Sequence, residues 1–404
     1  MARLAFMASV TLCVSAALPA CGPIDEPKEA EKPKETKKSK ANEAKQALKD
    51  ARKAEKKGKY DTAMGLYSRA YELRPSHFDT VDQYVNFLIS RRQFGKAVEV
   101  ASKFLNKSPD ELRRYHLLAD AQMAAQEWVA AHETLTQLID LDGTNALAFE
   151  KRGTVQSQRE DFDKAMEDLR KALEMEPENA DFHASFGAAL LRANRLGEAR
   201  IELDSAIQLD AEHARAHILL GTVLRNQKEV DDALQIHEKA VKLAPENAEA
   251  FFELGFTQNY ARDNAGAELS MRKATELDPD NPIYWYAYGE VLRAVDRNDD
   301  AATQYRRALE LDPEYSKAAN KLGVVLLAAG NFEEAEAVLT ERVRNHPNDD
   351  ETYFNLGRAY GEQKKFKLAY EALEKFISVA PKDDRRVAEA KKLIRLYRRK
   401  SRVR

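Results

Sequence analysis

A proline returns at a fixed interval along most of this chain of 404 residues. Pro279 and Pro313 stand 34 residues apart, and the same register continues in both directions. Gly143 and Ala211 occupy the two positions of the register that lack proline. A fixed period of this length is typical of repeat proteins, in which each repeat packs mainly on its neighbours. The prolines in register are Pro75, Pro109, Pro177, Pro245, Pro279, Pro313, Pro347 and Pro381.

Two small residues follow the same register. Alanine stands 12 residues before each of the ten positions, from Ala63 to Ala369. Glycine stands a further 12 residues earlier in seven of the repeats, from Gly153 to Gly357. Small residues at matching places let two helices approach closely while larger side chains fill the space to either side. The pattern therefore predicts one point of close contact inside each repeat.

Each repeat is predicted to hold two helices. In the eighth repeat, Trp285, Tyr288 and Leu292 have helical spacing, and Ala301 and Tyr305 have it again further on. Polar residues from 296 to 300 separate the two segments. The expected repeat is thus a helical hairpin.

The turn between repeats also has a recognisable sequence. Proline ends the second helix of a repeat because it lacks the backbone N–H that a helix interior needs. Asparagine follows two positions later in several repeats, as at Asn179 and Asn247. Asparagine is a favoured N-cap, so we expect it to cap the first helix of the next repeat.

Composition agrees with helix throughout. The chain has only 16 glycines and 13 prolines, and 32% of its residues are charged. The net charge of −3 argues against a nucleic-acid-binding protein, whose binding face is strongly basic. No nucleic-acid partner is therefore expected.

At this level of detail the chain resembles the tetratricopeptide repeat family. The resemblance covers ten repeats over residues 44–383 and implies an all-α, right-handed superhelical solenoid. A capping helix is expected in the segment 384–404, which ends in a basic tail. The residues of the eighth repeat that match the family pattern are Trp285, Tyr288, Gly289, Leu292, Ala301, Tyr305, Ala308 and Pro313.

The resemblance also implies a concave groove, lined by the first helix of each repeat, that holds a protein partner as a peptide or a helix. Phe252, Phe256 and Tyr260 share one helix face by their spacing. Aromatic side chains beside arginines are typical of a binding hot spot. The alternative is that closure of the superhelix buries these rings. The predicted groove residues are Ile218, Arg225, Asn226, Phe252, Phe256, Asn259, Tyr260, Ile283, Tyr286 and Arg293.

The N-terminus reads as an export signal. An apolar run follows Arg3 and is too short to span a bilayer permanently. Residues 18–21 resemble the lipobox of bacterial lipoproteins, so we predict a signal peptide over 1–20, lipidation of Cys21 and a disordered linker over 21–43. The alternative is ordinary signal-peptide cleavage after Ala17, which would give a soluble periplasmic protein.

These features predict a non-catalytic scaffold without cofactor or metal, anchored by lipid to the outer membrane and facing the periplasm. It would bind other proteins and help to assemble an envelope complex, for example pilus secretin or peptidoglycan machinery. An adaptor that is soluble in the periplasm, or a protein that binds peptidoglycan through the basic tail, is the alternative. Nothing in the sequence fixes the oligomeric state.

Two local patterns raise other chemistry. Asp140 and Asp142 match the first motif of a phosphatase family, but that chemistry requires the motif to end a buried parallel strand, and the preceding segment is helical in pattern. His213 and His217 are four residues apart, as metal ligands on a helix would be. His217 lies at a packing position of the repeat, so a core histidine is the favoured interpretation.

Overall fold

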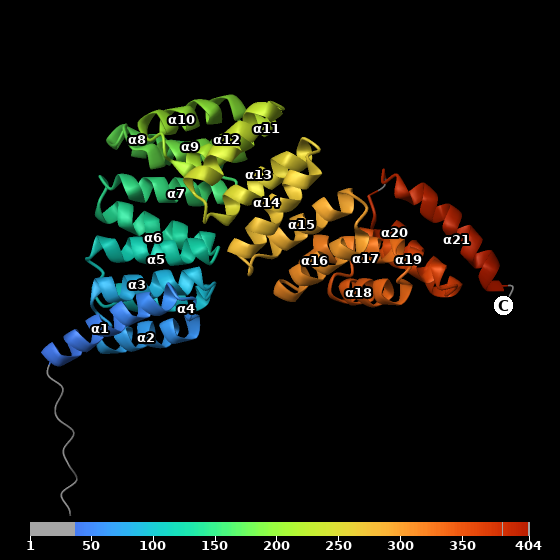
Figure 1. The fold of residues 1–404 in the computed structure, drawn as a ribbon, viewed down its shortest axis with the longest axis horizontal. Coiled ribbons are helices and arrows are strands. Elements are labelled where there is room, and N and C mark those ends of the chain that lie inside the picture. Colours follow the sequence, from blue (N-terminus) through green and yellow to red (C-terminus); the bar gives the residue numbers. More distant parts are fainter. Residues whose placement is uncertain (1–36, 382, 403–404) are drawn as a thin grey trace, which may run out of the picture. The chain divides into compact units, whose positions relative to one another are not determined.

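The computed structural model describes residues 37–381 and 383–402, and every regular element within them is an α-helix (Figure 1). The predicted signal peptide over 1–20, the predicted lipidation of Cys21 and residues 22–36 of the predicted linker lie outside the described residues.

The chain divides into two compact units, Met1–Tyr84 and Val85–Arg404. The first unit holds α1 (Lys37–Glu55), α2 (Tyr60–Leu73) and the start of α3 (Phe78–Ser90). The second holds the rest of α3 and all later helices. These are α4 (Phe94–Leu105), α5 (Leu112–Ala124), α6 (Trp128–Leu141), α7 (Ala146–Gln158), α8 (Phe162–Met175), α9 (Ala180–Arg192), α10 (Leu196–Leu209), α11 (Ala214–Asn226), α12 (Val230–Leu243), α13 (Ala248–Tyr260), α14 (Asn264–Leu277), α15 (Pro282–Ala294), α16 (Asn298–Leu311), α17 (Ser316–Ala328), α18 (Phe332–Asn345), α19 (Asp350–Glu362), α20 (Phe366–Val379) and α21 (Arg386–Arg402).

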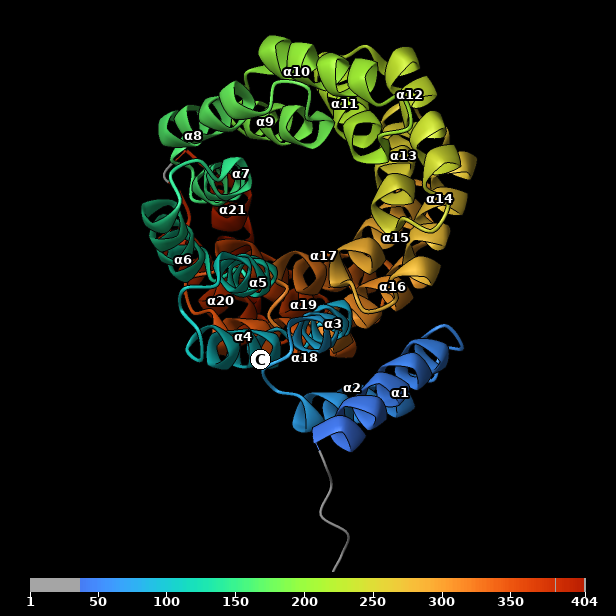
Figure 2. The same ribbon diagram turned by 90° about the vertical axis from the view of Figure 1, so that its left-hand side faces the viewer.

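The helices form ten successive pairs followed by α21, which confirms the predicted all-α solenoid of helical hairpins. In the second unit, the odd-numbered helices from α7 to α15 lie on the inner side and their even-numbered partners on the outer side (Figure 2). The terminal helix α21 buries Ala390, Ile394 and Tyr397 against α20, as expected of a capping helix.

One boundary was predicted wrongly. Helix α1 begins at Lys37, so residues 37–43 are helical and do not belong to the linker predicted over 21–43. The buried stripe of α1 runs through Ala44, Ala47, Leu48 and Ala51. Lysine and alanine are good helix formers. The helix that this stripe fixes therefore continues towards the N-terminus beyond Ala44, the first residue of the stripe.

The asparagines between repeats cap helices as predicted. The side chain of Asn179 accepts hydrogen bonds from the backbone N–H of Asp181 (3.1 Å) and Phe182 (3.3 Å) at the start of α9. Asn247 does the same at the start of α13. In these repeats the asparagine after the proline therefore fixes where the next first helix begins.

The glycines in register mark the contact between paired helices. A Cβ atom on Gly153 in α7 would lie 2.7 Å from Cγ of Leu169 and 2.9 Å from the carbonyl oxygen of Ala165 in α8. Both distances are too short for carbon, so only glycine permits this approach. Four repeats place leucine opposite the glycine, in the pairs Gly153–Leu169, Gly187–Leu203, Gly323–Leu339 and Gly357–Leu373.

The sixth repeat fills this place with a histidine. His237 is fully buried opposite Gly221, with Nε2 3.1 Å from the carbonyl oxygen of Ile218 and Nδ1 3.0 Å from Oγ1 of Thr257. Since a carbonyl only accepts, Nε2 carries the hydrogen and Nδ1 accepts from the threonine hydroxyl. Burial of the ring lowers the pKa of His237 to about 4.

The turn inside each repeat has a feature that the sequence did not reveal. In each repeat, one residue of the turn that follows the first helix has a positive φ. These residues also recur at intervals of 34. Glu160 is an example, where the N–H of Asp161 reaches back to the carbonyl of Gln156 (2.9 Å) and closes the helix. Only two of the ten are glycine. They are Gly58, Arg92, Gln126, Glu160, Asn194, Lys228, Arg262, Asp296, Gly330 and Lys364.

We expect Gly153→Ala to lower the free energy of unfolding by about 1–2 kcal/mol, because the added methyl group collides with Ala165 and Leu169. The matched control is Gly197→Ala in the first turn of α10, where nothing lies within 4 Å of the new Cβ. The control should leave stability unchanged or raise it by up to about 1 kcal/mol. Urea unfolding followed by circular dichroism tests both, and equal effects of the two changes would contradict the contact.

A second prediction concerns acid stability. Between pH 7 and pH 5 the unfolded chain protonates residue 237 while the folded chain keeps it neutral, so stability falls as the pH is lowered. Between pH 7 and pH 5 we expect the free energy of unfolding of His237→Leu to fall by up to about 2 kcal/mol less than that of the wild type. Urea unfolding of both proteins at the two pH values measures the difference. Identical pH dependence in the two proteins would show that this histidine protonates in the folded state.

Candidate functional site

Three helices on the inner side of the second unit, α11, α13 and α15, carry the predicted groove residues (Figure 2). Phe256 and Tyr260 on α13 are 45% and 53% exposed, and Ile283 on α15 is 48% exposed. Phe256 and Tyr260 are one turn apart on α13, and Ile283 is on the next inner helix, so exposed apolar side chains occur on two neighbouring inner helices. We call this set the inner apolar patch, defined by Phe256, Tyr260 and Ile283.

The rings of Tyr284, Phe252 and Phe256 form a row that supports the patch from one side. Phe252 is half-buried, and the centre of its ring lies 5.1 Å from that of Tyr284 and 6.3 Å from that of Phe256. Aromatic pairs at these separations are attractive beyond the area that they bury. Phe252 therefore holds Phe256 in place, and less of its own ring is open to a partner.

Arg225 is not a free cation. Its guanidinium lies 4.6 Å from the ring centre of Phe256, and its Nη1 donates to Glu253 Oε2 (2.7 Å) and Thr257 Oγ1 (2.9 Å). Only 10% of the side chain is exposed. Arg225 thus fixes the position of Phe256 through a cation–π contact and forms an ion pair with Glu253.

Ile218 does not line the groove as predicted. Its side chain is 3% exposed and belongs to a buried cluster with Ala240 and Ala250. Because both neighbours are alanines, α12 and α13 can approach α11 closely and cover this side chain. The position occupied by Ile218 in its repeat is held by the larger Phe252 in the next.

The other predicted groove residues differ in accessibility. Asn226 is exposed and Asn259 is half-buried. Tyr286 is half-buried against Tyr305 (5.8 Å between ring centres) and Tyr315 (5.2 Å), and burial raises its pKa to about 12. Arg293 pairs with Glu290 (3.2 Å), so it too has a carboxylate of its own.

A polar network crosses the inner side from α7 to α11, and Glu150 was missed by the sequence analysis. Thr154 donates to the Glu150 carboxylate (3.2 Å), which also bonds the hydroxyl of Ser185 on α9. Arg215 on α11 donates to the same hydroxyl (3.2 Å). Glu150 stands three repeats before Phe252 at the same position of the repeat, which is the signal that could have found it.

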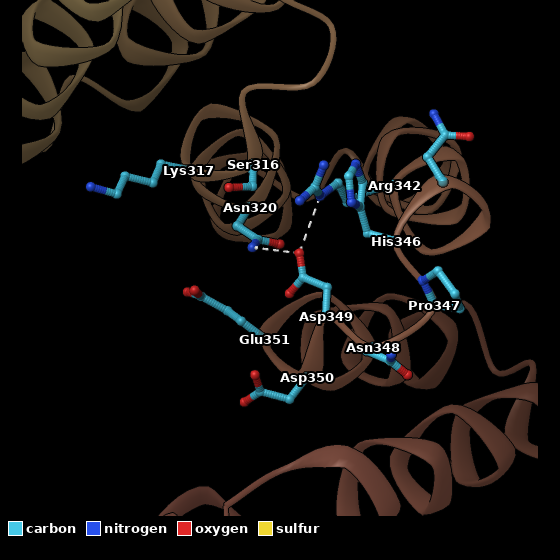
Figure 3. Close-up of a pocket in the computed structure, with 11 residues that line it drawn as sticks. Ser316, Lys317, Asn320, Arg342, His346, Pro347, Asn348, Asp349, Asp350 and Glu351 are labelled. Atoms are coloured by element: carbon cyan, nitrogen blue, oxygen red, sulfur yellow. Dashed lines mark hydrogen bonds and ion pairs between the residues drawn. The ribbon is translucent and has the colours of Figure 1, made fainter. Parts of the chain in front are cut away.

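A pocket of about 510 Å³ lies where α17, α18 and α19 meet (Figure 3). Asp349 points between Arg342, whose Nε is 3.1 Å away, and Asn320, and it also accepts from the N–H of Thr352 (3.1 Å). These bonds lower the pKa of the Asp349 carboxyl, against the effect of its burial. Hollows occur at the same turn of other repeats, around Pro75, Pro177 and Pro245, and so this pocket follows from the repeat geometry.

The remaining sequence patterns do not form reactive sites. Asp140 lies in the last turn of α6, and Asp142 accepts from the N–H (3.1 Å) and hydroxyl (2.7 Å) of Thr144. Helix α6 leads into this motif where the phosphatase chemistry requires a strand, so the phosphatase alternative lacks the context that it requires. His217 is 1% exposed, which makes it a core residue.

Within residues 37–381 and 383–402, His, Cys, Asp and Glu side chains do not gather in any group that could hold a metal ion. Among the same residues, no helix combines the length and the apolar character needed to cross a bilayer.

Known structures share this fold. A crystal structure of the APC/C hetero-tetramer Cut9–Hcn1 is 15% identical, covers 88% of this chain and 76% of its own, and superposes with a TM-score of 0.52. YrrB, described as a TPR protein with an unusual peptide-binding site, is 25% identical over 47% of this chain and 97% of its own, with a TM-score of 0.41. PilF of Pseudomonas aeruginosa is 22% identical over 52% and 97%, with a TM-score of 0.45. No curated protein matches the sequence.

Family models match most of the second unit. The tetratricopeptide repeat domain of cytochrome c-type biogenesis protein H matches residues 258–387. Two general tetratricopeptide repeat models match residues 157–223 and 203–248. Together with the ten helix pairs, these matches identify the chain as a tetratricopeptide repeat protein.

Proposed function

We propose that this protein is a non-catalytic scaffold of the cell envelope, and that the inner side of its second unit binds a segment of a partner protein. The inner apolar patch carries the proposal. Its three members lie on neighbouring inner helices, and Phe256 is held rigid by Phe252 and Arg225. A rigid aromatic group beside apolar neighbours loses little entropy when it is covered, which is typical of a binding hot spot.

The process that the scaffold serves is a separate proposal. The match of residues 258–387 to the domain of cytochrome c-type biogenesis protein H supports the biogenesis of c-type cytochromes. It favours that process over the pilus secretin and peptidoglycan machinery that the sequence analysis offered as examples.

Binding at the patch can be tested by mutation of the full chain. Phe256→Ala with Tyr260→Ala should weaken capture of a partner by at least tenfold, since each hot-spot ring contributes about 2 kcal/mol. Both rings are exposed, so the free energy of unfolding should change by less than about 1 kcal/mol. Phe252 is left intact because its removal would disturb packing.

The matched control is Leu269→Ala on the outer helix α14, where the side chain is 56% exposed. A photo-crosslinking amino acid placed at 260 or at 269 in growing cells should give a specific protein adduct only at 260. Adducts that are equal at the two positions, or capture that survives the double change, would exclude the inner surface as the binding site.

Lipid anchoring at Cys21 also remains a proposal, supported by the lipobox-like sequence from 18 to 21. Replacement of Cys21 by serine removes the thiol to which the lipid would be attached, so the protein should move from the membrane fraction to the soluble fraction. The control is Cys13→Ser, within the predicted signal peptide, which should leave the membrane fraction unchanged. Membrane association that survives Cys21→Ser would disprove the anchor.

A further inference from the structure

Three glutamates on α7 and α13, Glu150, Glu249 and Glu253, lie near two arginines of α11, Arg215 and Arg225. Lys151 is a further cation near Glu150, but it is paired with Asp120 (2.5 Å). Arg225 is committed to Glu253 at 2.7 Å, and this pair is largely covered. Arg215 is therefore the one remaining cation among these groups, and it stands opposite two carboxylates.

The two carboxylates respond as groups that lack a full counter-charge. Burial raises the pKa of Glu150 despite its hydrogen bond with Ser185 and the nearby charges of Arg215 and Lys151. Glu249 is exposed, but crowding on the concave side raises its pKa by desolvation, and the charge of Glu253 raises it further. Among the described residues, no side chain donates a hydrogen bond to the Glu249 carboxylate, while Arg215 already donates to Ser185.

Glu249 lies one turn before the aromatic residues of α13. Glu249, Phe252, Phe256 and Tyr260 follow one another on α13 at intervals of three or four residues, so they share one face. Burial raises the pKa of Tyr284, and the charge of Glu249 raises it further. The ring centre of Tyr284 is 5.1 Å from that of Phe252. Along this face of α13 the groups are thus the carboxylate of Glu249, the ring of Phe252 with Tyr284 tilted against it from α15, and then the inner apolar patch.

The spacing limits what can cover this face. Glu249 and Phe256 are seven residues apart on the helix, or about 10 Å along its axis. About three residues of an extended chain span the same distance. A cation three residues from an apolar side chain would then meet the carboxylate and the patch at the same time.

We propose that the inner surface binds an extended partner segment that places a lysine or arginine on Glu249 and, about three residues away, an apolar side chain on Phe256 and Tyr260. The inference rests on the proposed function, because it names the chemistry of the partner at the same surface. The cation would supply the charge that Glu150 and Glu249 lack, and the nearby rings of Tyr284 and Phe252 would favour it further.

The probe for this proposal is a library of random short peptides displayed on phage and selected on the immobilised full chain. The expected result is enrichment of peptides with lysine or arginine two to four positions from a large apolar residue. Glu249→Gln should weaken the selected peptides by about tenfold, which corresponds to about 1.4 kcal/mol. Glu238→Gln, an exposed site on the outer helix α12, makes the same charge change and should have no effect.

The pH dependence of binding gives a second measurement. The raised pKa of Glu249 means that its carboxylate is protonated at a higher pH than usual, so affinity for a basic peptide should begin to fall at a higher pH than an ordinary glutamate would give. This fall should be smaller in the Glu249→Gln variant, which has nothing to protonate there. Fluorescence anisotropy with one selected peptide measures both proteins.

The outcomes separate the two proposals. Selected peptides without an excess of basic residues, or equal affinity in wild type and Glu249→Gln, would overturn the charge assignment and leave the binding surface intact. Failure to select any peptide, together with no effect of the Phe256→Ala and Tyr260→Ala pair on capture in cells, would overturn both.

Discussion

The close contact between the two helices of each repeat is the constraint on which the structure depends. At Gly153 the backbone of α7 comes so near to Ala165 that no other residue fits without displacing a neighbour. The large residue opposite the glycine is leucine in four repeats and is His237, Met271 or Tyr305 in three others. Because the backbone contact is fixed by the small residues, the large position can vary and still stack each pair on the next.

The sequence predicted this architecture well because its signals are local and repeated ten times. The small residues set the helix contact, proline ends the second helix, and Asn179 and Asn247 cap the next helix as expected. The start of α1 was predicted too late, because the helix continues before Ala44 through residues that carry no apolar pattern. The turn residues with positive φ could not be found from the sequence, because eight of the ten are polar or charged residues of several types and only two are glycine.

The candidate site was harder to predict because accessibility depends on neighbours that are distant in sequence. Position in the repeat placed Ile218 and Phe252 in equivalent places, but alanines at 240 and 250 let the helices close over Ile218. Position in the repeat also suggested that Arg225 was available to a partner. In the structure Arg225 forms an ion pair with Glu253, and its guanidinium lies over the ring of Phe256. The same register could have found Glu150, but no rule from the sequence gives its shared hydroxyl partner on α9.

The turn residues with positive φ are all exposed where they are not glycine. Their geometry is set by backbone hydrogen bonds such as that from Asp161 to Gln156, and so the side chain is free to vary. Glu160, Asn194, Lys228 and Arg262 therefore form a regular series of attachment points, one in each successive repeat. Dyes, crosslinkers or charges placed there would report distances along the solenoid while leaving the helix contacts and the inner surface unaltered.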